Sequence, residues 1–218
     1  MARYEELYQG KTQKFTIRNA TGADAAEVIR YMSLVNQEST FLSMEPGEFA
    51  AKTTLEHETE LLQSLVDSTT HLSLLVQAED GQIAGSCNCR YSTERNRYCH
   101  RATLGISVRK DFQRQGLARR MLQIQEDWCR TQGIEKLCLD VDTLNTSAIS
   151  LYLSQGFVVE GTLHREAKMS DGTYRDLYVM AKFLKKKPPL PRENYPAAGV
   201  LPFVGFRTRA GSPSKVSN

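Results

Sequence analysis

VRKDFQRQGLA, residues 108–118, is typical of a strand end, a polar turn and a glycine that begins an amphipathic helix. Such a turn leaves the first backbone amides of the helix without partners, and with the positive end of the helix dipole they attract an anion. Gly116 would let a phosphate group approach the main chain closely. The helix that follows has an apolar stripe, which predicts its buried face: Leu117, Met121, Ile124 and Trp128. Further attraction comes from the basic residues Arg109, Lys110, Arg114, Arg119 and Arg120. The stretch alone fits either a phosphate-binding turn or an ordinary strand-to-helix connection.

A second pattern follows further along the chain. KLCLDVD, residues 136–142, alternates apolar and polar residues, which predicts a half-buried strand. Asn145 then caps a predicted helix that Gly156 ends. Asn145 and Tyr152 share one face of this helix, roughly 10 Å apart along its axis, with the small Ala148 between them. Together the two patterns indicate a long ligand, with a phosphate at one end and chemistry at the other.

The two patterns resemble the motifs of the GCN5-related N-acetyltransferase (GNAT) superfamily. QRQGLA, residues 113–118, is similar to the family's Q/R-x-x-G-x-G/A pyrophosphate turn. The later residues match its N-x-x-A-x-x-x-Y-x-x-x-G-F pattern from Asn145 to Phe157, and residues 156–184 resemble its closing hairpin. The resemblance covers roughly Phe15 to Leu184. It implies an α/β (α+β) fold, with a mixed, mostly antiparallel sheet of about seven strands flanked by about four helices.

The resemblance also implies an enzyme: an N-acetyltransferase that moves an acetyl group from acetyl-CoA to a primary amine by direct attack in a ternary complex. The absence of a recognisable Ser–His–Asp or Cys–His arrangement agrees with a reaction that has no covalent enzyme intermediate. By resemblance, main-chain groups around Ile106 and Val108 pair with the pantetheine arm. The implied cofactor-binding residues are Ile106, Val108, Gln113, Arg114, Gln115, Gly116, Leu117, Ala118, Asn145 and Tyr152. Asn145 could instead serve only as a helix cap.

The reaction needs a proton donor and a proton acceptor. Tyr152 is the candidate general acid, because a phenol with a pKa near 10 is protonated at neutral pH. Many relatives use a strand glutamate as the base, but residues 100–107, HRATLGIS, contain no carboxylate. Substitutes are Glu38, Glu45 and Glu48 in the loop where this fold normally builds the acceptor site, and His100. We take Glu38 as the first candidate, since it directly follows the first helix of the chain, which the apolar spacing predicts over residues 21–36.

Composition limits the other possibilities. The chain of 218 residues is long enough for one well-packed domain, and a net charge of +3 gives no argument for nucleic acid. No apolar run reaches the roughly 18 residues of a membrane span, and the N-terminus lacks the apolar core of a signal peptide. The five cysteines have no zinc-ligand spacing. We therefore expect a cytoplasmic protein with free thiols, no bound metal and no membrane contact.

The chain divides into three parts. Residues 1–13 are expected to form an N-terminal lead, and residues 14–184 the GNAT domain. Residues 185–218 begin with the run KKKPPLPR and are expected to form a mostly irregular Pro- and Lys-rich extension, since proline disfavours regular structure. The apolar stretch 200–206 within it could dock on the domain or on a neighbouring subunit, so a homodimer remains open.

Two other phosphate-binding folds lack their motifs here. No G-x-x-x-x-G-K-S/T run follows Gly116, and no early G-x-G-x-x-G is present. The remaining alternative is a non-catalytic acyl-CoA-binding sensor or assembly module with the same fold, supported by the strand that lacks a carboxylate and by the long tail. The acceptor also remains open, as an amine-bearing small molecule or a peptide.

Overall fold

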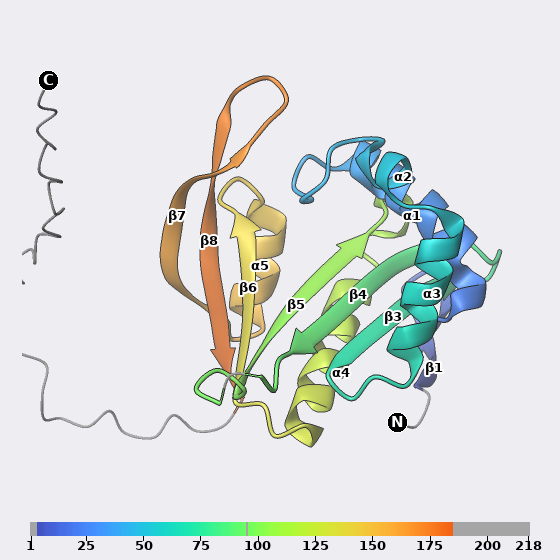
Figure 1. Ribbon diagram of the computed structural model, residues 1–218, viewed down its shortest axis with the longest axis horizontal. Helices are drawn as coiled ribbons and strands as arrows, with labels where there is room; N and C mark the ends of the chain where they lie inside the picture. The colour runs from blue at the N-terminus through green and yellow to red at the C-terminus, as the bar shows by residue number, and fades with distance from the viewer. Residues whose placement is uncertain (1–3, 95, 185–218) are drawn as a thin grey trace, which may run out of the picture. The chain divides into compact units, whose positions relative to one another are not determined.

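The structure is a computed structural model that describes residues 4–94 and 96–184. Its centre is one sheet of eight strands in the order β1-β2-β3-β4-β5-β6-β8-β7, with helices on both sides (Figure 1). The α/β prediction, with a mixed and mostly antiparallel sheet, is therefore confirmed. The predicted extension, 185–218, lies outside the described residues. No helix of the described residues is long and apolar enough to cross a membrane.

All neighbouring strands are antiparallel except β5 and β6, which are parallel. The strands are β1 (Glu5–Gln9), β2 (Lys14–Asn19), β3 (His71–Ala78), β4 (Ile83–Tyr91), β5 (Arg101–Val108), β6 (Lys136–Asp142), β7 (Val158–Lys168) and β8 (Tyr174–Phe183). β1 adds a strand in the stretch expected to be an N-terminal lead. It is a short edge strand that pairs only with β2 among the described residues. Two glutamates and a glutamine among its five residues give no clear strand pattern in the sequence.

The helices are α1 (Ala25–Glu38), α2 (Glu48–Lys52), α3 (Leu55–Val66), α4 (Leu117–Thr131) and α5 (Thr146–Ser154). Two short 3-10 turns, Gly22–Asp24 and Lys110–Phe112, complete the set. The sequence analysis did not predict α2, whose N-cap is Gly47 at a φ of 82°. A left-handed residue after Pro46 lets the chain turn sharply into this single helical turn.

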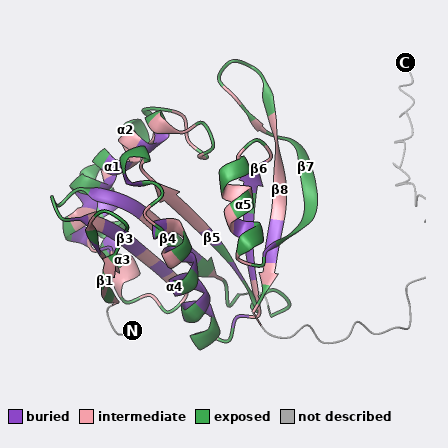
Figure 2. Ribbon diagram, turned by 180° about the vertical axis from the view of Figure 1, so that it is seen from behind, coloured by how far each residue is buried: buried purple, intermediate pink, exposed green. Residues whose placement is uncertain are grey.

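Two apolar clusters lie on opposite faces of the sheet. On one face, α4 and α5 cover a large cluster that includes Leu74, Met121 and Leu137. On the other face, α1 and α3 cover a smaller cluster around Val28, Leu62 and Leu75. The predicted α4 stripe of Leu117, Met121, Ile124 and Trp128 is buried. Figure 2 shows buried residues in β3, β4, β6 and the inner side of α4, while β7 is exposed along its length.

Candidate active site

The sheet opens between its two parallel strands. β5 pairs with β4 from Ala102 to Val108, but it pairs with β6 only from Arg101 to Thr103. Beyond Thr103 the two strands diverge, and Figure 1 shows the separation between β5 and β6. The outer edge of residues 104–108 therefore has no neighbouring strand within the described part of the chain, so it offers backbone hydrogen-bonding groups to an extended ligand. Ile106 and Val108, the residues predicted to bind the pantetheine arm, lie in this unpaired half.

The predicted phosphate turn follows directly from the open edge. Arg114 and Gly116 have left-handed φ angles of 64° and 87°, and α4 begins after Gly116. A Cβ atom at Gly116 would lie 2.5 Å from the Tyr8 hydroxyl, so only glycine fits there. Within residues 4–94 and 96–184, no acceptor pairs with the backbone amides of Leu117, Ala118 and Arg119. These amides are free for an anion, as the sequence predicts.

The glutamines of the turn bind the protein itself. Gln113 Nε2 donates to the Val108 carbonyl oxygen (3.4 Å). The Gln115 side chain accepts from the Thr12 amide (3.0 Å) and donates to Thr12 Oγ1 (2.7 Å). These two side chains therefore hold the shape of the turn, which leaves its main chain to bind a ligand. The side chain of Arg114 is exposed beside them.

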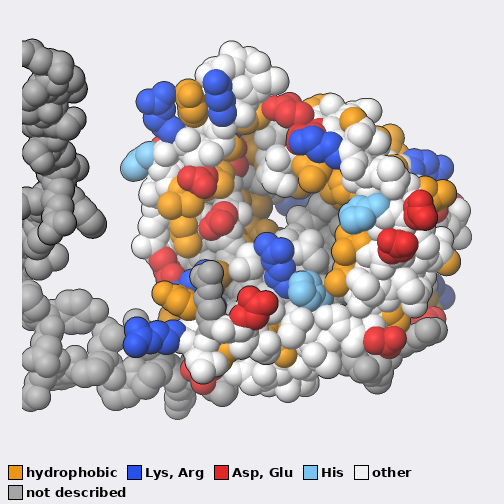
Figure 3. Space-filling model, in the orientation of Figure 1, with side chains coloured by type: hydrophobic (Ala, Val, Ile, Leu, Met, Phe, Trp, Pro, Cys, Tyr) orange, Lys and Arg blue, Asp and Glu red, His pale blue; other side chains and the backbone are white. Residues whose placement is uncertain are grey.

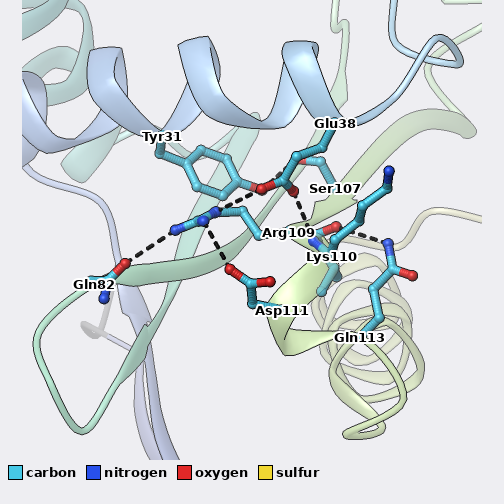
Figure 4. Close-up of polar contacts among 9 residues, drawn as sticks. Tyr31, Glu38, Gln82, Ser107, Arg109, Lys110, Asp111 and Gln113 are labelled. Atoms are coloured by element: carbon cyan, nitrogen blue, oxygen red, sulfur yellow. Dashed lines mark hydrogen bonds and ion pairs between the residues drawn. The ribbon is translucent and has the colours of Figure 1, made fainter.

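Glu38 connects the end of α1 to the start of this turn (Figure 4). Arg109 Nε donates to Glu38 Oε1 (3.2 Å), and the Lys110 amide donates to Glu38 Oε2 (2.7 Å). Arg109 also contacts Gln82 (3.1 Å) and Asp111 (3.2 Å), and its side chain is only 12% exposed. Both Glu38 oxygens thus accept hydrogen bonds from the residues that join β5 to the turn.

Tyr152 and Asn145 come from α5, which lies beside β6. Tyr152 is 8% exposed and packs against the Phe157 ring at 5.7 Å, and burial raises its pKa to about 12. Its hydroxyl has no hydrogen-bond partner among the described residues, yet it is not fully enclosed. Asn145 Oδ1 accepts from the Ala148 amide (3.2 Å), so Asn145 does cap α5. The arrangement leaves a protonated phenol with an unused hydroxyl.

The other base candidates lie in different places. Glu45 accepts from the Ser170 amide (3.2 Å), which joins the α1–α2 loop to the β7–β8 turn. Glu48 pairs with Lys52 on α2 and accepts from the Glu45 amide (2.9 Å). His100 precedes β5 at the end where β5 and β6 still pair. Of these residues, only Glu38 contacts the junction of β5 and the phosphate turn.

A carboxylate that the sequence analysis did not select lies beside the open edge. The β5–β6 register ends at Thr103 and Cys138, so two residues further along Asp140 stands opposite Gly105 across the split. Residues two apart on a strand share a face, and on that face Asn88 of β4 pairs with Gly105 from the other side. Asp140 is exposed, and its carboxylate has no ion pair or hydrogen bond within the described part of the chain. The alternation of KLCLDVD predicts that Asp140 lies on the other face of its strand from Leu139. It does not predict that this face borders the unpaired half of β5.

No described helix covers the face of β6, β8 and β7 that carries Asp140. Helices α1 and α2 lie on the other side of the split from these strands (Figure 1). The space-filling view is hollowed between the two sides (Figure 3). The unpaired edge of β5 borders the split, and Asp140 of β6 lies across the split from it. No group of three or more His, Cys, Asp or Glu residues that could hold a metal occurs among the described residues.

Residues 38–157 match the model of the family described as the acetyltransferase (GNAT) family. Over 112 residues the chain is 35% identical to an L-amino acid N-acetyltransferase from Escherichia coli, covering 50% of this chain and 66% of that protein. Over 81 residues it is 41% identical to a ribosomal protein bS18-alanine N-acetyltransferase from Salmonella typhimurium, covering 37% of this chain and 54% of that protein. The chain thus spans between half and two thirds of the curated relatives it matches.

A solved structure supports the same similarity over a longer range. The crystal structure of an acetyltransferase of the GNAT family from Streptococcus pneumoniae superposes with a TM-score of 0.71 at 32% identity. The match covers 78% of this chain and 99% of that structure. It therefore covers a larger share of this chain than either curated relative does.

Proposed function

The chain belongs to the acetyltransferase (GNAT) family, and we propose on that premise that it transfers an acetyl group from acetyl-CoA to a primary amine by direct attack. The observation that carries the proposal is the unpaired half of β5, which runs without interruption into a turn with free backbone amides. An extended arm that ends in phosphates matches both features, because strand edges bind extended chains and helix N-termini bind phosphates.

The residues present fit acetyl-CoA. Main-chain amides at Gly116, Leu117 and Ala118 would hold the pyrophosphate, and Arg114 would add positive charge beside it. Main-chain groups of Ile106 and Val108 would hold the pantetheine arm. When bound, acetyl-CoA supplies the acetyl group as a reactive thioester. The backbone amides of β5 polarise the acyl carbonyl, a role in which the amide and not the side chain matters.

Tyr152 holds the proton that the departing sulfur needs. Burial raises the pKa of Tyr152 to about 12, so the phenol is protonated across the physiological range. Its hydroxyl is unused by the described protein, so it is available to donate. Asn145 begins α5 and orients the helix that carries Tyr152.

Two carboxylates can take the proton from the incoming amine. Glu38 is the candidate from the sequence, but both of its oxygens already accept from Arg109 and the Lys110 amide. Asp140 faces the open edge of β5 without a partner among the described residues. We therefore assign the base to Asp140, directly or through water, and assign Glu38 to the positioning of the phosphate turn.

The test combines binding and turnover in one preparation. Calorimetry should show acetyl-CoA binding, and a thiol assay should show CoA release when an amine panel is added. Binding with turnover on one amine class would support the proposal. Binding without turnover on any amine would favour the sensor alternative, and a folded protein that binds no acetyl-CoA would contradict the reading of the phosphate turn.

A further inference from the structure

Two exposed arginines lie on the open face of the sheet, close to the split. Arg90 of β4 pairs with Thr103 of β5, and Arg101 lies two residues before Thr103 on the same strand. Both therefore share a face with Asn88, Gly105 and Asp140. As diagonal neighbours on adjacent strands, their Cα atoms are about 7–8 Å apart. Neither guanidinium has an ion pair or hydrogen bond within the described part of the chain.

The charges of this face act on one another. Burial raises the pKa of the Cys138 thiol, while Arg101 and Lys136 lower it and Glu160 and Asp140 raise it. Arg101 and Asp140 therefore lie within electrostatic range of the same buried atom. Lys136 Nζ forms an ion pair with Glu160 Oε2 (2.6 Å). Arg90 and Arg101 have no carboxylate partner among the described residues. Two unpaired guanidinium groups side by side repel each other, and an anion between them removes that cost.

The spacing matches a small ligand with opposite charges. Arg90 lies in the row of Thr103, about 7 Å along the strands from the row of Gly105 and Asp140, and Arg101 lies four residues, about 13 Å, from that row. Arginine side chains are long enough to extend along the strands toward that row, and their planar fork binds a carboxylate through two hydrogen bonds. A ligand whose amine is at the split beside Asp140 would have its anionic group directed toward the arginines.

We infer that the acceptor is a free amino acid, whose amine lies beside Asp140 and whose carboxylate is bound by Arg90 and Arg101. The inference rests on the proposed function and specifies its substrate class. The same arginines disfavour a polyamine, since they repel its additional positive charges. They also disfavour a peptide N-terminus, which has no carboxylate next to its amine and would leave the cations unpaired.

The experiment compares amino acids with their amides, which differ only in the carboxylate. With saturating acetyl-CoA, the wild-type chain should acetylate one or more free amino acids, and kcat/KM should be at least about 10-fold higher than for the matching amide. In the double variant Arg90→Gln/Arg101→Gln, kcat/KM for the free amino acid should fall by about 10- to 100-fold, while kcat/KM for the amide should change by less than about 3-fold. Arg90→Lys keeps the positive charge but loses the planar guanidinium, so its kcat/KM for the free amino acid should lie between those of the wild type and the double variant.

The control is Arg30→Gln, which removes an exposed arginine of α1 whose partner among the described residues is its helix neighbour Glu27. This variant should leave both kcat/KM values unchanged. The inference alone fails if amides or spermidine are acetylated as well as free amino acids, or if the double variant lowers both rates equally. If acetyl-CoA binds and no amine is acetylated, the proposed function fails and the inference fails with it.

Discussion

The two halves of the sheet are built differently. β2, β3 and β4 have helices on both faces, and five of the eight β3 residues are buried: Leu72, Leu74, Leu75, Val76 and Ala78. β6, β8 and β7 are covered by helices on one face only, and ten of the eleven β7 residues are exposed. The β4–β5 register continues to Val108, whereas the β5–β6 register stops after three pairs.

The difference separates two tasks. On the proposed function, the half that is covered on both faces supplies stability and, through β5 and the phosphate turn, the donor site. The half with a bare face supplies Asp140 directly and Tyr152 through α5. Substitutions in the first half should therefore change stability or acetyl-CoA binding, and substitutions in the second should change turnover.

The largest effect is expected on the bare side. Asp140→Asn removes the proposed base while keeping its shape, so kcat/KM should fall by about 10²- to 10⁴-fold. Acetyl-CoA affinity by calorimetry and the melting temperature should stay close to wild type. Glu38→Gln is the matched control: it should weaken acetyl-CoA binding several-fold and leave the pH dependence of kcat unchanged. If Glu38→Gln abolishes the pH dependence of kcat while Asp140→Asn keeps a kcat/KM near wild type, Glu38 and not Asp140 is the base.

The next effect concerns stability. Leu74→Ala in β3 empties a fully buried position and should lower the free energy of unfolding by about 2–5 kcal/mol. Val158→Ala in β7 changes a side chain that is 55% exposed, so it should change the free energy of unfolding by no more than about 0.5 kcal/mol. Urea unfolding measures both. Similar losses in the two variants would show that the bare face is packed against something in solution, and the comparison of the two halves would then need revision.

Tyr152→Phe tests the proton donor. The variant should lower kcat by about 10²-fold, because the hydroxyl is lost while the ring still packs against Phe157. Since burial raises the pKa of Tyr152 to about 12, the wild-type phenol stays protonated as the pH rises from 7 to 10. The wild-type kcat should therefore show no alkaline decrease in that range. A decrease centred below pH 10 that disappears in Tyr152→Phe would contradict the assignment.

The smallest effect compares two left-handed glycines. Gly116→Ala would place a Cβ 2.5 Å from the Tyr8 hydroxyl at a φ of 87°, so it should cost about 1–3 kcal/mol of stability and weaken acetyl-CoA binding. Gly172→Ala in the β7–β8 turn has a similar φ of 84° but nothing within 4 Å of the new Cβ. It should cost only about 1 kcal/mol and leave acetyl-CoA binding unchanged. Thermal unfolding and calorimetry compare the two, and equal losses of acetyl-CoA binding would contradict the role of the turn.

Local patterns predicted much of this fold. The alternation of KLCLDVD predicted β6, and the apolar spacing from Leu117 to Trp128 predicted the buried stripe of α4. The glycine at 116 and the cap at Asn145 have the geometry that the sequence analysis expected. These features depend on a few neighbouring residues, so the sequence shows them directly. The assignments of the catalytic and cofactor-binding residues remain predictions.

The split between β5 and β6 was harder to predict, because it depends on two strands whose paired residues Ala102 and Leu137 are far apart in the sequence. Asp140 was overlooked for the same reason, since its significance depends on which residue lies across the split. The hydrogen bond between Glu38 and Arg109 also joins segments that are far apart in the sequence, so local sequence patterns do not reveal it.

The three-pair connection between β5 and β6 has a consequence for the protein in the cell. An extended ligand along residues 104–108 completes the sheet edge that the chain leaves open, so it acts as a further strand. On the proposed function, folding and acetyl-CoA binding are therefore thermodynamically linked. At a concentration 100 times its Kd the ligand would add about 2.7 kcal/mol to the free energy of unfolding. The lifetime of the protein would then follow the supply of activated acetyl groups, even when no acceptor is present.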